Sequence, residues 1–427
     1  MASGYDQIRK SGKLENEEEV IGIDIDDEYA LVSYYKSGMD EPDTLSVITG
    51  QERYQIPVIL YREVKDNIWL FGARAKKAAQ SGNGLCYKNL LEKAYRDESV
   101  TLMSDQMYSW EMLGIFFEKL LYLAQRAGMN LESSKVVITA KHLDFKRAKV
   151  LEKAMDKAGV KRSNLVLVDH LESFFAFTFH QTPDRWLHDV VLFEYDGRKL
   201  VQNYLVRDAS TTPQMVTIKQ KEFYELSFAD DSVKRDLAFE KILNEEFAQK
   251  RISTVYLIGD GFEGEWMKKS LNVLCNNRKV FMGKNLYTKG ACYLLMIPKE
   301  GWNYLYMGKS AMKMNLALKA KVRGEMEMIS MINAGENCYG SYCACDLLLD
   351  EEPYIEIYQQ NPDGSGKKLN SLELVDLPKR PKKATKVHLR LIPVSDSKVE
   401  VYVEDMGLGQ IFPSSGKSWT FILEGGK

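Results

Sequence analysis

Residues 20–25 read Val-Ile-Gly-Ile-Asp-Ile, and they are followed by Asp-Asp-Glu at 26–28 and by a second apolar run at 29–35. A short continuous apolar run bounded by turn residues predicts a buried strand. The acidic triplet predicts the turn that leads into an antiparallel partner. The ordered part of the chain is therefore predicted to begin with a β-hairpin.

A second hairpin pattern follows, with a strand at 190–194, a turn at Asp196-Gly197 and a strand at 200–206. Each hairpin is followed by further helix and strand signals. In the first copy, the predicted helices are 104–128, 144–157 and 171–179, and the predicted strands are 136–139 and 165–168. In the second copy, the predicted helices are 236–249 and 262–274, and the predicted strand is 255–259. The recurrence predicts an α/β fold with an internal duplication.

After residue 313 the helical patterns give way to short alternating runs separated by turn residues, which predicts an all-β domain. The expected strands are 314–322, 326–332, 342–348, 354–358, 369–374, 387–392 and 399–403. The whole chain is accordingly divided into a disordered acidic tail at 1–19, an α/β domain at 20–300 with lobes at 20–185 and 186–300, a connector at 301–312, and an all-β domain at 313–427.

Composition narrows the functional classes. The chain has 427 residues with 45% hydrophobic and 28% charged residues, which is typical of a globular protein. A formal net charge of −2 argues against a protein that coats nucleic acid. No apolar run approaches the ~20 residues that span a bilayer, and we expect no membrane contact. Six cysteines and a polar N-terminus predict a reducing, cytoplasmic location.

The order of these patterns resembles the superfamily of actin, hexokinase and heat-shock chaperone ATPases, and across 20–410 it resembles the DnaK-type chaperones. The segments that carry the resemblance are 21–25, 56–59, 71–76, 87–91, 136–159, 191–197, 257–261, 354–359, 372–381, 387–392 and 399–409. The resemblance implies a duplicated actin-like (ribonuclease-H-like) two-lobed ATPase fold joined to a C-terminal β-sandwich that holds extended peptides.

The resemblance also implies where a nucleotide would bind, as ATP or ADP with magnesium. The counterparts of catalytic groups, if the protein is active, are Asp24, Lys88 and Glu194. Contacts to the nucleotide would fall on Asp26, Asp27, Gly197, Gly259, Asp260 and Gly261. No spacing of side chains predicts a metal site that the protein forms by itself.

Several positions depart from the pattern of the family. Asp-Asp-Glu at 26–28 replaces a Gly-Thr-Thr phosphate cradle. Each carboxylate of this triplet that lies ~4–6 Å from a nucleotide phosphate would cost on the order of a few kcal/mol, because both groups are negatively charged. The second hairpin keeps only Gly197 of three glycines, and Glu194 stands in place of the metal-positioning aspartate. These changes predict a degenerate cleft without hydrolysis, and no counterpart of the peptide-trapping helical lid precedes Lys427.

Three further groups of residues have two interpretations each. Cys338, Cys343 and Cys345 lack the fourth ligand of a zinc site and are interpreted as buried thiols. The basic run at 379–383 suggests a solvated loop or a contact for an acidic partner. Methionines near the start of the all-β domain suggest either core or a flexible peptide-binding surface, and these are Met312, Met314, Met326, Met328 and Met331.

The leading hypothesis is a cytoplasmic, chaperone-like scaffold that binds a protein or an extended peptide and has an inactive nucleotide cleft. The first alternative is an active or nucleotide-binding ATPase chaperone with altered phosphate contacts, which includes weak nucleotide binding without turnover. The second alternative is an actin-like scaffold of the cell envelope or division machinery. The sequence leaves the partner and the oligomeric state open.

Overall fold

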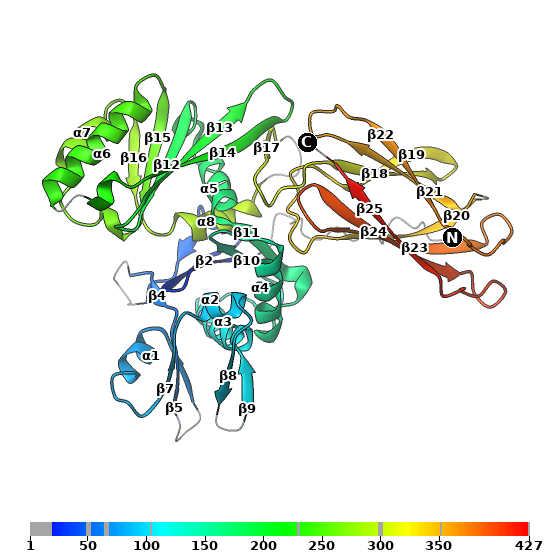
Figure 1. The fold of residues 1–427 in the computed structure, drawn as a ribbon, viewed down its shortest axis with the longest axis horizontal. Helices are drawn as coiled ribbons and strands as arrows, with labels where there is room; N and C mark the ends of the chain where they lie inside the picture. The colour runs from blue at the N-terminus through cyan, green and yellow to red at the C-terminus, as the bar shows by residue number, and fades with distance from the viewer. Residues whose placement is uncertain are drawn as a thin grey trace. The chain divides into compact units, whose positions relative to one another are not determined.

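The computed structural model describes residues 19–47, 53–63, 68–102, 105–228, 231–297, 302–350 and 352–425. The described residues divide into two compact units, 19–306 and 307–425 (Figure 1). The predicted acidic tail at 1–19 lies outside the described residues except for Glu19. The Glu19 carboxylate accepts hydrogen bonds from the backbone N–H of Asn130 (2.8 Å) and from Ser134 Oγ (3.2 Å).

The first sheet of the N-terminal unit forms around the opening hairpin. Its strand order is β11-β10-β1-β2-β3, and β4 also pairs with β2. The bounds are β1 Val20–Ile25, β2 Tyr29–Tyr35, β3 Asp43–Thr44, β4 Ile56–Pro57, β10 Lys135–Ala140 and β11 Leu165–Asp169. β1 is antiparallel to β2 and parallel to β10, which is parallel to β11. The predicted hairpin and both later strands are confirmed.

The second sheet repeats this sequence of strand directions. Its order is β16-β15-β12-β13-β14-β17. The bounds are β12 Asp189–Tyr195, β13 Leu200–Asp208, β14 Gln214–Phe223, β15 Ile252–Ile258, β16 Lys279–Met282 and β17 Tyr304–Tyr306. β12 is antiparallel to β13 and parallel to β15, which is parallel to β16. The fold is therefore mixed α/β, as predicted.

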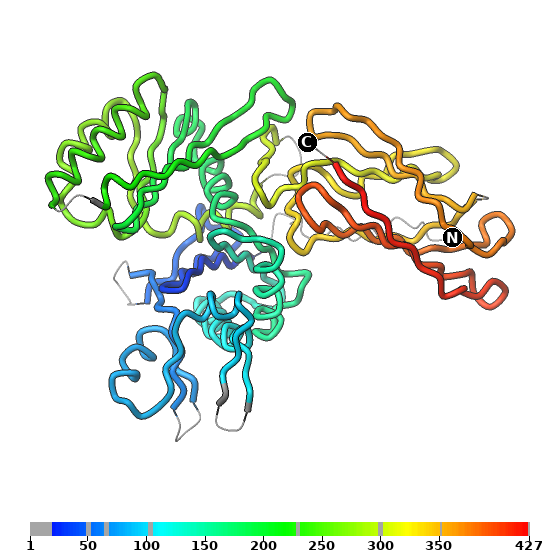
Figure 2. Tube along the Cα trace, in the orientation of Figure 1, coloured from blue at the N-terminus to red at the C-terminus, as the bar shows by residue number. Residues whose placement is uncertain are grey.

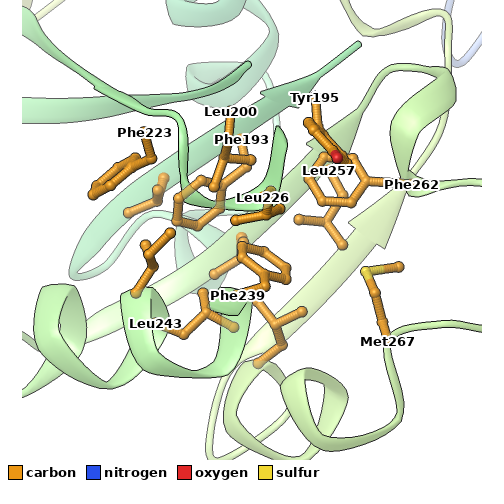
Figure 3. Packing of buried hydrophobic residues seen from close by; sticks show 14 of the residues in the cluster. Phe193, Tyr195, Leu200, Phe223, Leu226, Phe239, Leu243, Leu257, Phe262 and Met267 are labelled. Atoms are coloured by element: carbon orange, nitrogen blue, oxygen red, sulfur yellow. The ribbon is translucent and has the colours of Figure 1, made fainter. Parts of the chain in front are cut away.

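An aromatic core fills the space between the second sheet and its helices α6 (Ser232–Phe247) and α7 (Lys268–Leu274). Figure 3 shows Phe193 of the sheet close to Phe239 of α6. Phe262 of the turn after β15 contacts Phe239 and Tyr195. The three phenylalanine side chains are at most 1% exposed. Complete burial of a side chain of this size stabilises a fold by ~1.5–3 kcal/mol.

Helix α8 (Leu286–Leu294) follows the second sheet in sequence but packs against β1, β2 and β10 of the first. Thr288 Oγ1 donates to the Gly22 carbonyl (2.9 Å) and accepts from the Ser33 N–H (3.1 Å). A Cβ on Gly22 would lie 2.4 Å from the Thr288 carbonyl oxygen. Only glycine therefore allows α8 to cross β1 so closely.

The other helices of the first half differ from prediction mainly at their ends. Asp144 caps α4 as predicted by accepting from the Arg147 N–H (2.8 Å). The helix predicted from residue 104 begins only at Ser109, because residues 105–108 pair as a strand with β8. The bounds are α1 Gly72–Ala78, α2 Leu90–Tyr95, α3 Ser109–Arg126, α4 Phe145–Lys157, α5 His170–Phe179, β5 Leu60–Glu63, β6 Trp69–Phe71, β7 Gly84–Tyr87, β8 Ser99–Leu102 and β9 Asp105–Tyr108.

The C-terminal unit contains two four-stranded sheets, ordered β19-β18-β21-β22 and β20-β23-β24-β25. The bounds are β18 Asn315–Val322, β19 Glu325–Ile332, β20 Cys343–Leu349, β21 Tyr354–Gln360, β22 Lys368–Glu373, β23 Thr385–Pro393, β24 Lys398–Gly407 and β25 Ser418–Glu424. Gln359 Nε2 of the first sheet donates to the Glu424 carbonyl of the second (2.8 Å). All seven predicted strands are present, and β25 was not predicted.

Within the described ranges, every helix is too short or too polar to cross a lipid bilayer.

Candidate functional site

The two carboxylates predicted for catalysis are connected through two aromatic side chains. Asp24 of β1 lies 2.8 Å from His170 Nε2 at the start of α5. The His170 ring stacks on Tyr287 of α8, with centroids 4.0 Å apart and an interplanar angle of 16°. Tyr287 donates its hydroxyl to Glu194 Oε1 on β12 (2.6 Å). We call Asp24, His170, Tyr287 and Glu194 the bridging network.

Glu194 has further partners that occupy both carboxylate oxygens. Asn203 Nδ2 donates to Oε1 (2.7 Å), and Lys141 Nζ lies 3.2 Å from Oε2. Gln220 Nε2 in turn donates to Asn203 Oδ1 (2.8 Å), which fixes the orientation of that amide. Burial alone would raise the pKa of Glu194, but Lys141, His170 and the Tyr287 hydrogen bond hold that pKa below its ordinary value.

His170 is the counter-charge to Asp24. Burial of the ring lowers the pKa of His170, but the charges of Asp24 and Glu194 raise it by more than burial lowers it. The net pKa therefore lies above the ordinary value of 6.5. The raised pKa favours the protonated ring, and its positive charge, together with that of Lys141, would balance the charges of the two carboxylates. The His170 Nδ1 atom is buried and has no hydrogen-bond partner among the described residues.

In the first hairpin, the acidic side chains bind backbone N–H groups of the protein itself. Asp26 Oδ1 accepts from the N–H of Glu28 (2.6 Å) and of Tyr29 (2.7 Å). Asp27 Oδ1 accepts from the N–H of Glu92 (3.0 Å) in the first turn of α2. Burial raises the pKa of both aspartates despite these hydrogen bonds. The N–H groups of this hairpin are therefore engaged by its own carboxylate.

The second hairpin and the turn after β15 pack against each other. Gly197 has φ +88°, and Asp196 Oδ1 accepts from the N–H of Arg198 and Lys199 (2.8 and 2.9 Å). Gly259 has φ +106°, and a Cβ there would lie 2.3 Å from the Tyr195 carbonyl oxygen. A Cβ on Gly261 would lie 2.6 Å from the Gly197 N atom. These glycines are required by close backbone packing.

The other two predicted residues lie outside the bridging network. Asp260 forms an ion pair with Lys284 (2.7 Å), which also pairs with Glu263. Lys88 is exposed, in the short segment between β7 and α2. Neither of them contacts Asp24 or Glu194 in any interaction between described residues.

Sequence reasoning missed His170, Tyr287, Lys141 and Asn203. His170 and Lys141 had a weak signal, because each follows a parallel strand of the first sheet directly, at the edge where β1 also ends. Tyr287 had none, because α8 was not predicted. The sequence suggested that acidic side chains would face the phosphates of a nucleotide. In the structure, Asp24 and Glu194 are instead paired with side chains of the protein itself.

The methionines of the C-terminal unit divide into two groups. Met312, Met314 and Met331 are at most 1% exposed and belong to the core. Met326 and Met328 are 60% and 49% exposed on β19, which is an edge strand of its sheet. The three cysteines Cys338, Cys343 and Cys345 are buried, as interpreted from the sequence. The described residues contain no group of three or more His, Cys, Asp or Glu that could hold a metal ion.

Two family models match most of the chain. It belongs to the family described as "Family of unknown function (DUF5716) C-terminal", whose model matches residues 41–309. Residues 311–424 match a "Domain of unknown function (DUF8552)". No curated protein matches the chain. The two matches meet close to the division between the two compact units at Tyr306.

Proposed function

We propose that this member of the DUF5716 family is a chaperone-like scaffold that binds an extended segment of another protein and does not hydrolyse ATP. The N-terminal unit would be a duplicated actin-like fold, and the C-terminal unit a β-sandwich like that of the DnaK-type chaperones. The repeated strand directions of the two large sheets support the first part. The two four-stranded sheets support the second.

The bridging network is the observation that carries the loss of hydrolysis. Phosphoryl transfer requires donors and a metal ion that are free to neutralise phosphate charge. Here Asp24 is bound by His170, and Glu194 is bound by Tyr287, Asn203 and Lys141. A nucleotide would have to displace these partners and leave buried carboxylates unpaired. The cost would be ~1–3 kcal/mol or more for each group.

Peptide binding would use the exposed edge of β19. An edge strand presents unpaired N–H and C=O groups to which an extended segment can add by β-augmentation. Met326 and Met328 would give adaptable apolar contacts to the side chains of that segment. The hairpin turn at Arg323-Gly324, which joins β18 to β19, has φ values of +49° and +101°.

All six cysteines are free thiols, which agrees with a reducing, cytoplasmic setting.

We expect the thermal unfolding temperature of the full chain to be unchanged by millimolar ATP or ADP with magnesium. A ligand at ~100 times its dissociation constant would stabilise the fold by ~2.7 kcal/mol and shift the transition by several degrees. Differential scanning fluorimetry measures this shift, and a phosphate-release assay measures turnover. A clear shift with turnover that Asp24→Asn abolishes would instead favour the ATPase alternative.

Peptide binding is tested separately on arrays of extended peptides with the double variant Met326→Asp/Met328→Asp. We expect the change to weaken binding at least ~10-fold, because two charges would enter an apolar contact. Met282→Asp on β16 is the matched control, since Met282 is 65% exposed and lies in the other unit. Equal binding by both variants, or no peptide preference in the wild type, would contradict the proposal.

A further inference from the structure

A buried ion pair organises the connection between β24 and β25. Arg380 forms two hydrogen bonds with Asp405, from Nη1 to Oδ1 (2.7 Å) and from Nη2 to Oδ2 (2.8 Å). The side chains of Arg380 and Asp405 are 6% and 0% exposed. Ser415 adds donors to Asp405 Oδ2 from its N–H (2.9 Å) and its hydroxyl (2.6 Å). One carboxylate thus fixes both ends of the segment 405–415.

The same segment closes on itself beyond this anchor. Arg380 Nη2 also donates to the Pro413 carbonyl (2.8 Å), and the Leu408 N–H donates to the Phe412 carbonyl (2.6 Å). Gly407 has φ +62°, and a Cβ there would lie 2.3 Å from the Phe412 carbonyl oxygen. The hairpin of β24 and β25, red in Figure 2, ends in this connection. We call residues 406–416 the apolar tip.

The apolar tip exposes three large hydrophobic side chains close together in sequence. Met406, Leu408 and Ile411 are 47%, 41% and 82% exposed. Residues 406–416 contain no charged side chain. The exposure is held in place by the buried ion pair and the backbone hydrogen bonds. A fixed, uncharged, apolar projection of this kind indicates an interaction surface.

Basic side chains flank the apolar tip. Arg380 anchors the run 379–383 to the tip, and Lys417 follows the tip directly. Lys382 pairs with Asp350 (3.1 Å), and Lys417 lies 3.9 Å from Asp376. Lys379 and Lys383 are exposed and form no ion pair with a described residue. These two lysines leave positive charge available to an anionic partner.

We propose that the apolar tip and its lysines form a peripheral binding surface for an anionic lipid bilayer. The tip is a convex hairpin end, so a protein partner would need a matching cavity, whereas a bilayer interface accepts any apolar projection. Ile411 and Leu408 would enter the interfacial region, and Lys379 and Lys383 would lie near lipid phosphates. The proposed surface does not include the proposed peptide-binding edge of β19. It differs from the expectation from the sequence that no membrane is involved.

Co-sedimentation of the full chain with phosphatidylserine-containing and pure phosphatidylcholine vesicles tests the proposal. We expect binding to the anionic vesicles, weakened at high salt. Ile411→Asp should reduce partitioning at least ~10-fold, and Lys379→Gln/Lys383→Gln, which removes two positive charges, should reduce it roughly 25-fold, at ~5-fold per lysine. Met282→Asp, which changes an apolar side chain that is 65% exposed in the other unit, should leave partitioning unchanged.

Folding of the variants is checked by thermal unfolding, which the exposed positions should leave within about a degree of wild type. Absence of binding to anionic vesicles at low salt would overturn the proposal. Binding that survives both tip variants would overturn it as well, because it would locate the contact elsewhere. A tip-dependent partner that is a protein, with no vesicle binding, would also overturn it.

Discussion

Replacing Asp405 with alanine is expected to lower the free energy of unfolding by about 3–5 kcal/mol, because Arg380 would remain as a buried charge without its partner. Arg380 and the Ser415 donors hold the pKa of Asp405 far below its usual range. A depressed carboxyl pKa contributes stability above the unfolded value of 3.8, and that stability is lost as pH falls below it. Urea denaturation of the full chain at pH 7 measures the loss.

The matched variants for this prediction are Arg380→Ala and the double variant Asp405→Ala/Arg380→Ala. The double variant should lose less than the sum of the single variants, because neither charge is then left unpaired. Exposed ion pairs contribute only ~0–1 kcal/mol. A loss below ~1 kcal/mol for Asp405→Ala would therefore contradict the description of this pair as buried and coupled.

The second large effect is expected at His170. His170→Ala would remove the ring stacked on Tyr287 and leave Asp24, whose side chain is 13% exposed, without its hydrogen-bond partner. The combined loss of packing and pairing should be ~3 kcal/mol at pH 6. Urea denaturation measures it, and His188→Ala, at an exposed position of the same unit, is the control.

The same variant predicts a pH dependence with a definite sign. The pKa of His170 is raised in the folded state, so its contribution is complete below the unfolded value of 6.5 and is lost as pH rises through the higher folded value. The difference in stability between wild type and His170→Ala should therefore shrink between pH 6 and pH 9. A difference that grows with pH would show that His170 is held neutral in the folded protein.

The hairpins were predictable because their apolar residues form short continuous runs bounded by turn residues. The strands of the C-terminal unit were predictable from alternation, which β23 and β24 show in strict order. Helix α8 was not, because most of its residues are buried, including Tyr287, Thr288 and Cys292, and no polar face marks its period. β25 was missed because the long uncharged segment before it resembles an unstructured tail.

The candidate site was only partly readable for a related reason. Asp24 and Glu194 lie near the ends of the first strands of two similar hairpins. The resemblance to the ATPase superfamily implied that both belong to one site. The bridging network adds side chains from α5 and α8, and its Asp24–His170 pair alone joins residues 146 positions apart. Neither local propensity nor spacing contains that information. The role of Gly259 in packing against Tyr195 is hidden in the same way.

The place of α8 in the chain has a consequence for biosynthesis. The hydrogen bond between Thr288 and the Gly22 carbonyl joins residues 266 positions apart. Helix α8 begins 117 positions after β11 ends (286 − 169). At ~5–20 residues per second, a ribosome would therefore complete the first sheet on the order of 6–23 s before α8 is made. During that interval the nascent chain presents an uncovered apolar sheet face to the cell. We therefore expect its early folding to depend on nascent-chain chaperones.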